Sequence, residues 1–267
     1  MNFLYITNDL YTAKAIDGIV DYIFIDLEKN GKEERQKNMD TVKSDHSILD
    51  IEPIKKSIKK SELLVRINPM FKGSYDEINS VIEAGADIIM LPFFKTVEEV
   101  AEFLNIVNNR VKTMLLVETR EAVDCLDEIL NLKGIGYVHI GLNDLSLSYK
   151  KKFMFELLCD GTVKKITQKI SKSKIPYGFG GIAALDTGTL KSNLIIEMHK
   201  ILESKQVILS RAFFNEVMNR HGQSNIQTGF KVEVDKIKEY YKNLRERDYD
   251  VVANEIFASI ERILNAK

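Results

Sequence analysis

The chain has 267 residues, 45% of them hydrophobic, and 38 Lys and Arg against 39 Asp and Glu give a formal net charge of −1. This length and apolar content suit one large α/β domain or two small ones, and the balanced charge gives no reason to expect a nucleic acid or a membrane surface as a partner. No apolar run approaches the roughly 20 residues of a membrane span, and the N-terminus lacks the features of a signal peptide.

Apolar runs alternate with amphipathic segments along most of the chain, which indicates strands followed by helices. In chain order the prediction is strand 3–6, helix 12–20, strand 22–25, a loop running into a solvated helix at 29–47, helix 51–60, strand 63–69, helix 74–84, strand 88–92, helix 96–109, strand 114–117, helix 121–132, strand 137–141, helix 156–173, strand 177–181, helix 190–203, strand 207–211 and helix 235–266, broken near Asp248. Capping boxes are predicted at Ser74–Glu77 and Thr96–Glu99, and a flexible connection at 222–233.

Eight strands that alternate with helices favour a parallel sheet, and at this length a closed (β/α)₈ TIM barrel. The competitor is a doubly wound open sheet, but no GxGxxG follows the first strand. We expect a barrel domain over residues 1–221 and a helical extension over 222–267 that packs on the barrel or on a neighbouring subunit. Cys125 and Cys159 are expected as free thiols in the core of a cytoplasmic protein.

Carboxylates follow two consecutive predicted strands: Glu118 ends the strand 114–117, and Asp144 follows the strand 137–141. Parallel neighbouring strands would place both at one rim of the barrel. A pair of hard oxygen ligands with open positions suits Mg²⁺ or Mn²⁺. The alternative is that each carboxylate caps the helix that follows it.

Further polar residues are expected at the same rim. Asp26 and Glu28 follow the strand 22–25, and Arg66 and Asn68 lie on the strand 63–69. Arg66 supplies a planar fork for a substrate carboxylate, while Asp26 and Glu28 are placed to orient metal-bound water. Alternatively, Arg66 simply neutralises Asp26 or Glu28.

Three other positions carry weaker signals. Ser210 and Arg211 end the last predicted strand, either at the rim of the site or as a helix start with a surface charge. His139 lies within a predicted strand and is interpreted as a core histidine rather than a ligand.

Five short motifs occur in an order that resembles the HpcH/HpaI aldolase and citrate lyase β-subunit superfamily. They are IDLE (25–28), VRINP (65–69), GADIIMLP (85–92), VET (117–119) and GLNDL (141–145). The resemblance implies a barrel of the phosphoenolpyruvate/pyruvate-binding type, a metal-stabilised enolate and a homo-oligomer. By position it makes Glu118 and Asp144 the metal ligands, and Arg66 the group that holds the substrate carboxylate or the enolate oxygen.

The chain also departs from that superfamily. Lys29 stands where the HpcH/HpaI branch has an acid–base histidine, and Leu116 stands where it has a glutamine. A lysine acts as a base only if its pKa falls well below about 10.4. Lys32 and Arg35 correspond to basic residues of the citrate lyase branch.

Together these observations predict a metal-dependent carbon–carbon lyase or aldolase that acts on a small 2-oxo acid. Arg66 and Lys29 are the expected catalytic residues, Glu118 and Asp144 the metal ligands, and Asn68 and Asn143 residues that bind substrate or support the site. The metal is Mg²⁺ or Mn²⁺, with Co²⁺ a further candidate. The alternatives are a CoA-thioester lyase of the citryl or malyl type, and a non-catalytic barrel that serves as a binding or assembly subunit.

Overall fold

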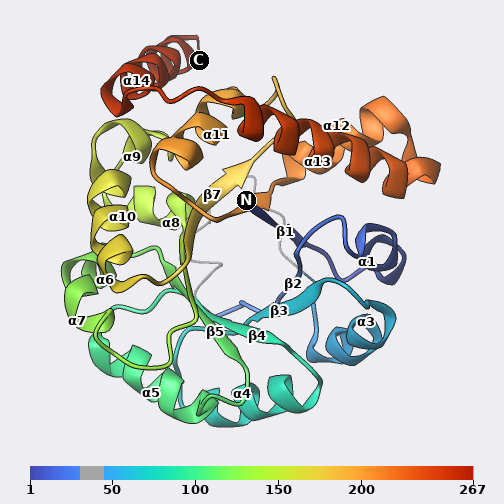
Figure 1. Cartoon of the computed structure of the whole chain (residues 1–267). Helices are drawn as coiled ribbons and strands as arrows, with labels where there is room; N and C mark the ends of the chain where they lie inside the picture. Colours follow the sequence, from blue (N-terminus) through green and yellow to red (C-terminus); the bar gives the residue numbers. More distant parts are fainter. Residues whose placement is uncertain (31–44, 267) are drawn as a thin grey trace.

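The computed structural model describes residues 1–30 and 45–266. Its eight strands run parallel, each paired with the next in chain order, and β8 pairs with β1 to close the barrel. Helices surround this barrel (Figure 1). The predicted (β/α)₈ fold is confirmed, and the open doubly wound sheet is excluded.

The bounds of the elements follow the alternation that the sequence predicts. The strands are β1 (Asn2–Ile6), β2 (Tyr22–Asp26), β3 (Glu62–Arg66), β4 (Ile88–Leu91), β5 (Lys112–Val117), β6 (Tyr137–Ile140), β7 (Tyr177–Ile182) and β8 (Gln206–Leu209). The helices are α1 (Leu10–Ile16), η1 (Ile48–Asp50), α3 (Ile51–Ser57), α4 (Ser74–Glu83), α5 (Val97–Val107), α6 (Arg120–Asp124), α7 (Leu126–Ile129), α8 (Leu142–Ser148), α9 (Glu156–Cys159), α10 (Thr162–Ser173), α11 (Ser192–Ile201), α12 (Arg211–His221), η2 (Gln223–Asn225), α13 (Ile226–Asn243) and α14 (Tyr249–Asn265).

Alternate side chains of each strand enter two separate cores. Side chains that point outward, such as Ile23 and Val65, pack under the helices. Side chains that point inward, such as Phe24, Leu64 and Met90, fill the barrel itself. The continuous apolar character of the strands therefore reflects burial on both faces.

Several helices are shorter than the hydrophobic pattern predicts. The first helix begins at Leu10, after Asp9 caps it, and ends before Gly18, whose φ of +78° an L-residue rarely adopts. The predicted helix 156–173 is divided at Gly161, which has a φ of +86°. The predicted helix 121–132 is likewise two short helices, α6 and α7, that meet at Cys125.

One of the two predicted capping boxes is wrong. The N-cap of α4 is Gly73 and not Ser74, and the carboxylate of Glu77 accepts hydrogen bonds from Asn68 instead. The capping box at Thr96–Glu99 is confirmed. The difference matters for the site described below, because Glu77 fixes the side chain of Asn68.

The predicted flexible connection at 222–233 is also wrong, because most of it belongs to α13. Ile226 and Phe230 are buried one turn apart, and Gly229 lets α13 approach α12 closely. A Cβ on Gly229 would lie 2.8 Å from Cγ1 of Val217. Helix α13 packs on α1 and α12, and α14 packs on α9 and α11. The division into two domains at residue 221 stays a prediction.

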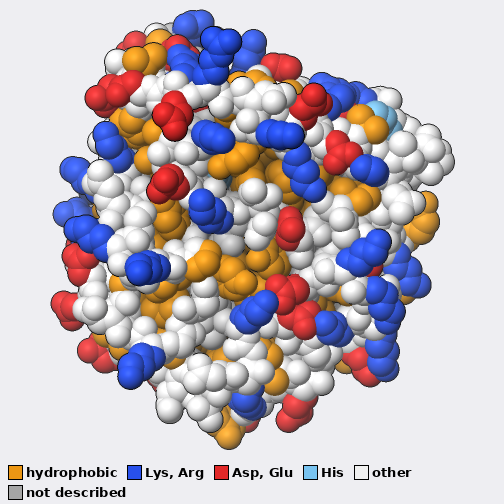
Figure 2. Space-filling model, viewed as in Figure 1, with side chains coloured by type: hydrophobic (Ala, Val, Ile, Leu, Met, Phe, Trp, Pro, Cys, Tyr) orange, Lys and Arg blue, Asp and Glu red, His pale blue; other side chains and the backbone are white. Residues whose placement is uncertain are grey.

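Acidic and basic side chains are intermixed over the visible face of the molecule (Figure 2), in keeping with the net charge of −1. Within the described residues, no helix is long and apolar enough to cross a membrane. Cys125 and Cys159 are free, as expected, but they are half-buried rather than core residues.

Candidate active site

A cavity of about 680 Å³ opens among the carboxyl ends of the strands, where the chemistry of a TIM barrel is expected. This volume lies within the usual range for small-molecule sites. Its lining includes all but one of the rim residues predicted on five strands, namely Asp26, Glu28, Arg66, Glu118, Asn143, Asp144, Ser210 and Arg211, while Asn68 is not part of the lining. The barrel thus brings together side chains up to 185 positions apart in the chain, the separation of Asp26 from Arg211.

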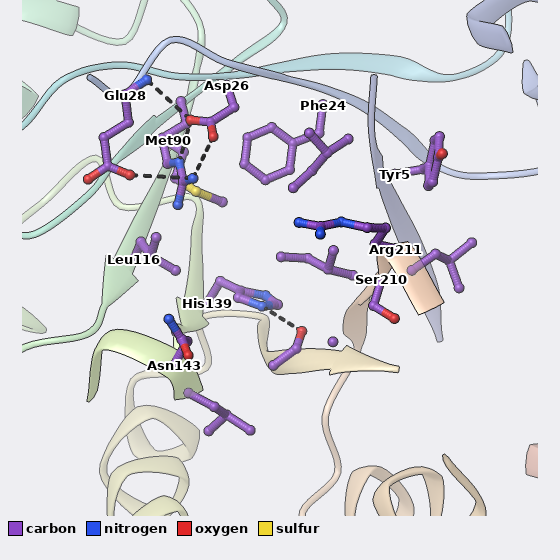
Figure 3. Close-up of a pocket in the computed structure, with 18 of the residues that line it drawn as sticks. Tyr5, Phe24, Asp26, Glu28, Met90, Leu116, His139, Asn143, Ser210 and Arg211 are labelled. Atoms are coloured by element: carbon purple, nitrogen blue, oxygen red, sulfur yellow. Dashed lines mark hydrogen bonds and ion pairs between the residues drawn. The ribbon is translucent and has the colours of Figure 1, made fainter. Parts of the chain in front are cut away.

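Arg66 is clamped by the acidic pair that follows β2. Its Nε and Nη2 donate to the two carboxylate oxygens of Asp26, each at 2.8 Å, and Nη2 lies 3.4 Å from Oε2 of Glu28. Figure 3 shows these contacts as dashed lines. Asp26 is itself held, since its backbone N–H donates to Nδ1 of His46 at 2.9 Å. The parallel register pairs Asp26 directly with Arg66, which explains the two-pronged contact.

The electrostatics of this cluster favour a permanent cation. Burial opposes the charge of Arg66, but Asp26 and Glu28 outweigh it and raise the pKa of the guanidinium. The interpretation of Arg66 as the partner of these acids is therefore confirmed. Two of its five N–H donors are used on Asp26. Its role toward a substrate stays a prediction.

Glu118 and Asp144 meet at the rim between β5 and β6. Val117 pairs with Ile140, so that Glu118 faces Gly141 across the strands. A Cβ on Gly141 would lie 2.8 Å from Oε2 of Glu118, which means that the glycine makes room for the carboxylate. Glu118 does not cap the following helix, because its Oε1 accepts from the N–H of Phe93 at 3.0 Å, and Thr119 caps α6.

The charge environment of Glu118 fits a cation site. Burial raises its pKa well above the usual range, and the nearby charge of Asp144 adds to the rise, although Arg66 lowers it. No group of three or more His, Cys, Asp or Glu that could hold a metal occurs within residues 1–30 and 45–266. Two carboxylates with the remaining positions left for water and substrate are a donor set that suits Mg²⁺ or Mn²⁺. The residues present therefore fit such an ion.

Lys29 and Asn68 take supporting places rather than central ones. Oδ1 of Asn68 accepts from the backbone N–H groups of Lys29 and Asn30, at 2.8 and 2.9 Å, while its amide donates to Glu77 at 2.6 Å. This arrangement fixes the chain where it leaves β2. The side chain of Lys29 is exposed and is not part of the described cavity lining. Lys32 and Arg35 lie outside the described residues.

Ser210 and Arg211 begin helix α12, and they also line the cavity. Oγ of Ser210 accepts from the N–H of Phe213 at 3.4 Å and caps the helix. Arg211 extends into the cavity from the wall opposite the acidic residues (Figure 3). Among the residues that the structure describes, no carboxylate forms an ion pair with it. Both alternatives considered for this pair, a helix start and a rim position, therefore hold.

Two histidines line the cavity, and neither was predicted to belong to the site. His46 fixes Asp26, but it lies 20 positions away in a polar stretch and carries no motif. His139 is buried, as expected of a core histidine, yet it lines the cavity. Its place within β6 alternates with the outward-facing Val138 and Ile140, and this period of two was the signal that it points into the barrel.

Comparison with known proteins decides the family. Residues 1–187 match the family model of the HpcH/HpaI aldolase/citrate lyase proteins. The chain belongs to this family. The match covers every candidate residue from Asp26 to Asp144 but not Arg211. Members of the HpcH/HpaI family are carbon–carbon lyases and aldolases, and the ordered motifs in the sequence are thereby explained.

Solved structures share the fold at low sequence identity. An HpcH/HpaI aldolase/citrate lyase family protein from Burkholderia cenocepacia is 13% identical, with 84% of this chain and 93% of that chain covered and a TM-score of 0.66. The protein CitE from Mycobacterium tuberculosis, in complex with magnesium and acetate, is 12% identical, with 96% of each chain covered and a TM-score of 0.59. Citrate synthase SbnG is 15% identical over 85% of this chain and 94% of its own, with a TM-score of 0.60. None of the curated proteins matches this chain.

Proposed function

We propose that the protein is a lyase or aldolase that depends on a divalent metal and acts on a small 2-oxo acid through a pyruvate-type enolate. The observation that carries this proposal is the convergence of Glu118, Asp144 and a rigidly held Arg66 on one cavity. Magnesium in the CitE structure from Mycobacterium tuberculosis adds support from the same fold.

Glu118 and Asp144 would hold Mg²⁺ or Mn²⁺, which acts as a Lewis acid on a carbonyl oxygen when bound. Arg66 would donate its remaining N–H groups to the substrate carboxylate or to the developing enolate oxygen. Because Asp26 already fixes the guanidinium plane of Arg66, the guanidinium needs little rearrangement when negative charge develops on the enolate oxygen. Arg211 would meet an anionic group on the other half of the substrate, and Asn143 would contact the substrate from α8.

The test is exchange of the methyl protons of pyruvate in D₂O, followed by NMR. We expect exchange with Mg²⁺ or Mn²⁺ that a chelator abolishes and that Glu118→Gln removes. The matched control is Glu62→Gln, because Glu62 lies at the amino end of β3, where it pairs with Lys112. This control should leave the exchange rate unchanged.

Two outcomes would contradict the proposal. Absence of exchange while metal is bound would exclude pyruvate-enolate chemistry, and citryl- or malyl-CoA would be the next substrates to test. Failure of those substrates as well, together with an intact biological role in Glu118→Gln, would favour a non-catalytic barrel.

A further inference from the structure

Three side chains that can donate hydrogen bonds stand together on one wall of the cavity. They are Tyr5 on β1, Ser210 after β8 and Arg211, the first residue of α12, and all three line the cavity. The register pairs Tyr5 with Leu209, so that Tyr5 lies beside the turn where Ser210 follows. Figure 3 shows the three on one side of the cavity, with the labelled acidic residues on the other. We call these three residues the donor wall.

The positive charge of Arg211 is not compensated within the protein. The first turn of α12 contains no acidic residue, and among the described residues no carboxylate forms an ion pair with this guanidinium. A cation at the start of a helix is opposed by the positive end of the helix dipole, and the first N–H groups of a helix lack an intrahelical acceptor. The ordinary explanation would be a solvated surface charge, since Arg211 is exposed.

Tyr5 argues against that explanation. Only 8% of this residue is exposed, because its ring packs against Phe214 and Phe230, with ring centroids 6.1 and 4.9 Å away. Its hydroxyl group has no hydrogen-bond partner among the described residues, although a buried tyrosine usually finds one. The hydroxyl oxygen is not one of the three fully enclosed polar atoms that lack a partner there, so it keeps accessible surface. A largely buried side chain of the cavity wall thus holds a free donor.

The environment of Tyr5 keeps this donor protonated. Burial raises the pKa of the hydroxyl, and the charge of Asp9 adds to the rise, so that the group is neutral near pH 7. Asp9 itself caps α1, where its Oδ1 accepts from the N–H and the hydroxyl of Thr12, at 2.7 and 2.6 Å. The Tyr5 hydroxyl therefore stays available to a ligand that accepts hydrogen bonds.

The neighbouring strand leaves space in front of the donor wall. Gly181, near the end of β7, lines the cavity, and a Cβ on it would lie 3.7 Å from Cβ of Ser210. A side chain at this position would stand directly beside Ser210, and the glycine keeps that space open. The loops after the seventh and eighth strands are also where TIM barrels frequently bind phosphate groups.

We propose that Tyr5, Ser210 and Arg211 form an oxyanion subsite that selects acceptor aldehydes ending in a carboxylate or a phosphate. The inference deepens the proposed function and rests on it. Arg211 presents a planar fork of N–H donors to two oxygens of the anion. Tyr5 donates its free O–H, and Ser210 can donate as well, because its Oγ only accepts from Phe213. The shared chemistry is a terminal oxyanion, and matched substrates distinguish its two forms.

The test is aldol addition of pyruvate, with Mn²⁺, to three aldehydes that differ only at the far end. In 4-oxobutanoate and glycolaldehyde phosphate, the carboxyl carbon and the phosphorus atom occupy the place of the methyl group of butanal. The variants are Arg211→Gln and Tyr5→Phe, and the second removes only the hydroxyl group while the ring keeps its packing on Phe214. The matched control is Tyr22→Phe, because Tyr22 is buried at the start of β2, accepts from Asn2 at 3.3 Å and does not line the cavity.

We expect the wild type to prefer at least one anionic aldehyde over butanal by about 10-fold or more in kcat/KM. Arg211→Gln should reduce this preference about 10-fold and Tyr5→Phe about 3- to 10-fold, both through KM rather than kcat, because the lost donors bind the anion and not the reacting atoms. Tyr22→Phe should leave the preference unchanged. The aldehyde whose advantage falls identifies the oxyanion as a carboxylate or a phosphate.

Three outcomes would overturn the inference while pyruvate exchange, and with it the proposed function, stays intact. They are a wild type without preference for either anion, an unchanged preference in Arg211→Gln or Tyr5→Phe, and an equal loss with all three aldehydes. A wild type that neither exchanges pyruvate protons nor forms an aldol product would instead contradict the proposed function. Calorimetry with inorganic phosphate and with succinate then decides the subsite. Binding that Arg211→Gln weakens about 10-fold would support oxyanion binding, and no binding, or binding that the variant leaves unchanged, would overturn it.

Discussion

The pairing of Arg66 with Asp26 makes a quantitative prediction about stability. Arg66→Met should lower the free energy of unfolding by about 3–5 kcal/mol, because it leaves the buried carboxylates of Asp26 and Glu28 without their cation. Asp26→Asn should cost less, about 1.5–3 kcal/mol. In that variant Arg66 keeps its contact with Glu28, and an amide oxygen still accepts one of the two hydrogen bonds.

The double variant separates the pair from its surroundings. In the Asp26→Asn background, Arg66→Met should lower the free energy of unfolding by less than it does in the wild type. We therefore expect a coupling energy of at least about 1.5 kcal/mol between the two side chains. The assay is urea unfolding of the four proteins at pH 7, monitored by circular dichroism. The control cycle is Lys112→Met with Glu62→Gln, whose side chains are 50% and 36% exposed and whose coupling should stay below about 1 kcal/mol. Additive effects in the Arg66 cycle would refute the view that Asp26 holds the guanidinium in place.

Three further predictions concern the cavity. Gly141→Ala should weaken Mn²⁺ binding, measured by calorimetry, about 10-fold or more, because the new Cβ would lie 2.8 Å from Oε2 of Glu118. Unchanged Mn²⁺ affinity would exclude the Glu118 carboxylate as a ligand. Arg211→Gln should raise the KM for an acceptor aldehyde with a terminal carboxylate about 10-fold relative to its effect on the KM for a neutral aldehyde of equal length. An equal effect on the two aldehydes would contradict binding of an anion by Arg211. As pH falls from about 6.5 to 4, the free energy of unfolding of the wild type, measured by urea titration, should drop by up to about 3 kcal/mol more than that of His139→Gln. The reason is that the histidine binds a proton in the unfolded chain but stays neutral in the folded protein, where its pKa is about 4. Identical pH profiles of the two proteins would argue against a buried neutral ring.

The rim acids could be predicted from the sequence because the reasoning needed only local information. An apolar strand that ends in a carboxylate, in a chain that alternates strands with helices, places that carboxylate at one known edge of the barrel. Glu118 and Asp144 follow this rule, and the register of β5 and β6 brings them to the same rim. Arg66 was predicted as a rim cation, and both of its proposed partners, Asp26 and Glu28, are in contact with it.

The supporting contacts could not be predicted because a local pattern does not choose among competing partners. Ser74–Glu77 has the spacing of a capping box, yet Glu77 binds Asn68, which the turn after β3 brings within reach. His46 accepts from the backbone N–H of Asp26, 20 positions earlier in the chain, and no sequence spacing marks this contact. In α13, which contains most of the predicted flexible connection at 222–233, Gly229 permits close helix packing.

The charged residues are divided between two sides of the cavity. Glu28, Glu118 and Asp144 lie together on one side, where Arg66 is already engaged by Asp26. The charges of Asp144 and Glu28 add to the rise that burial causes in the pKa of Glu118, and a cation placed among these carboxylates would stabilise them. Arg211 extends from the opposite wall, so that the two sides differ in sign (Figure 3). A substrate that bridges them would turn its oxo-acid half toward the carboxylates that would hold the cation and its other half toward Arg211.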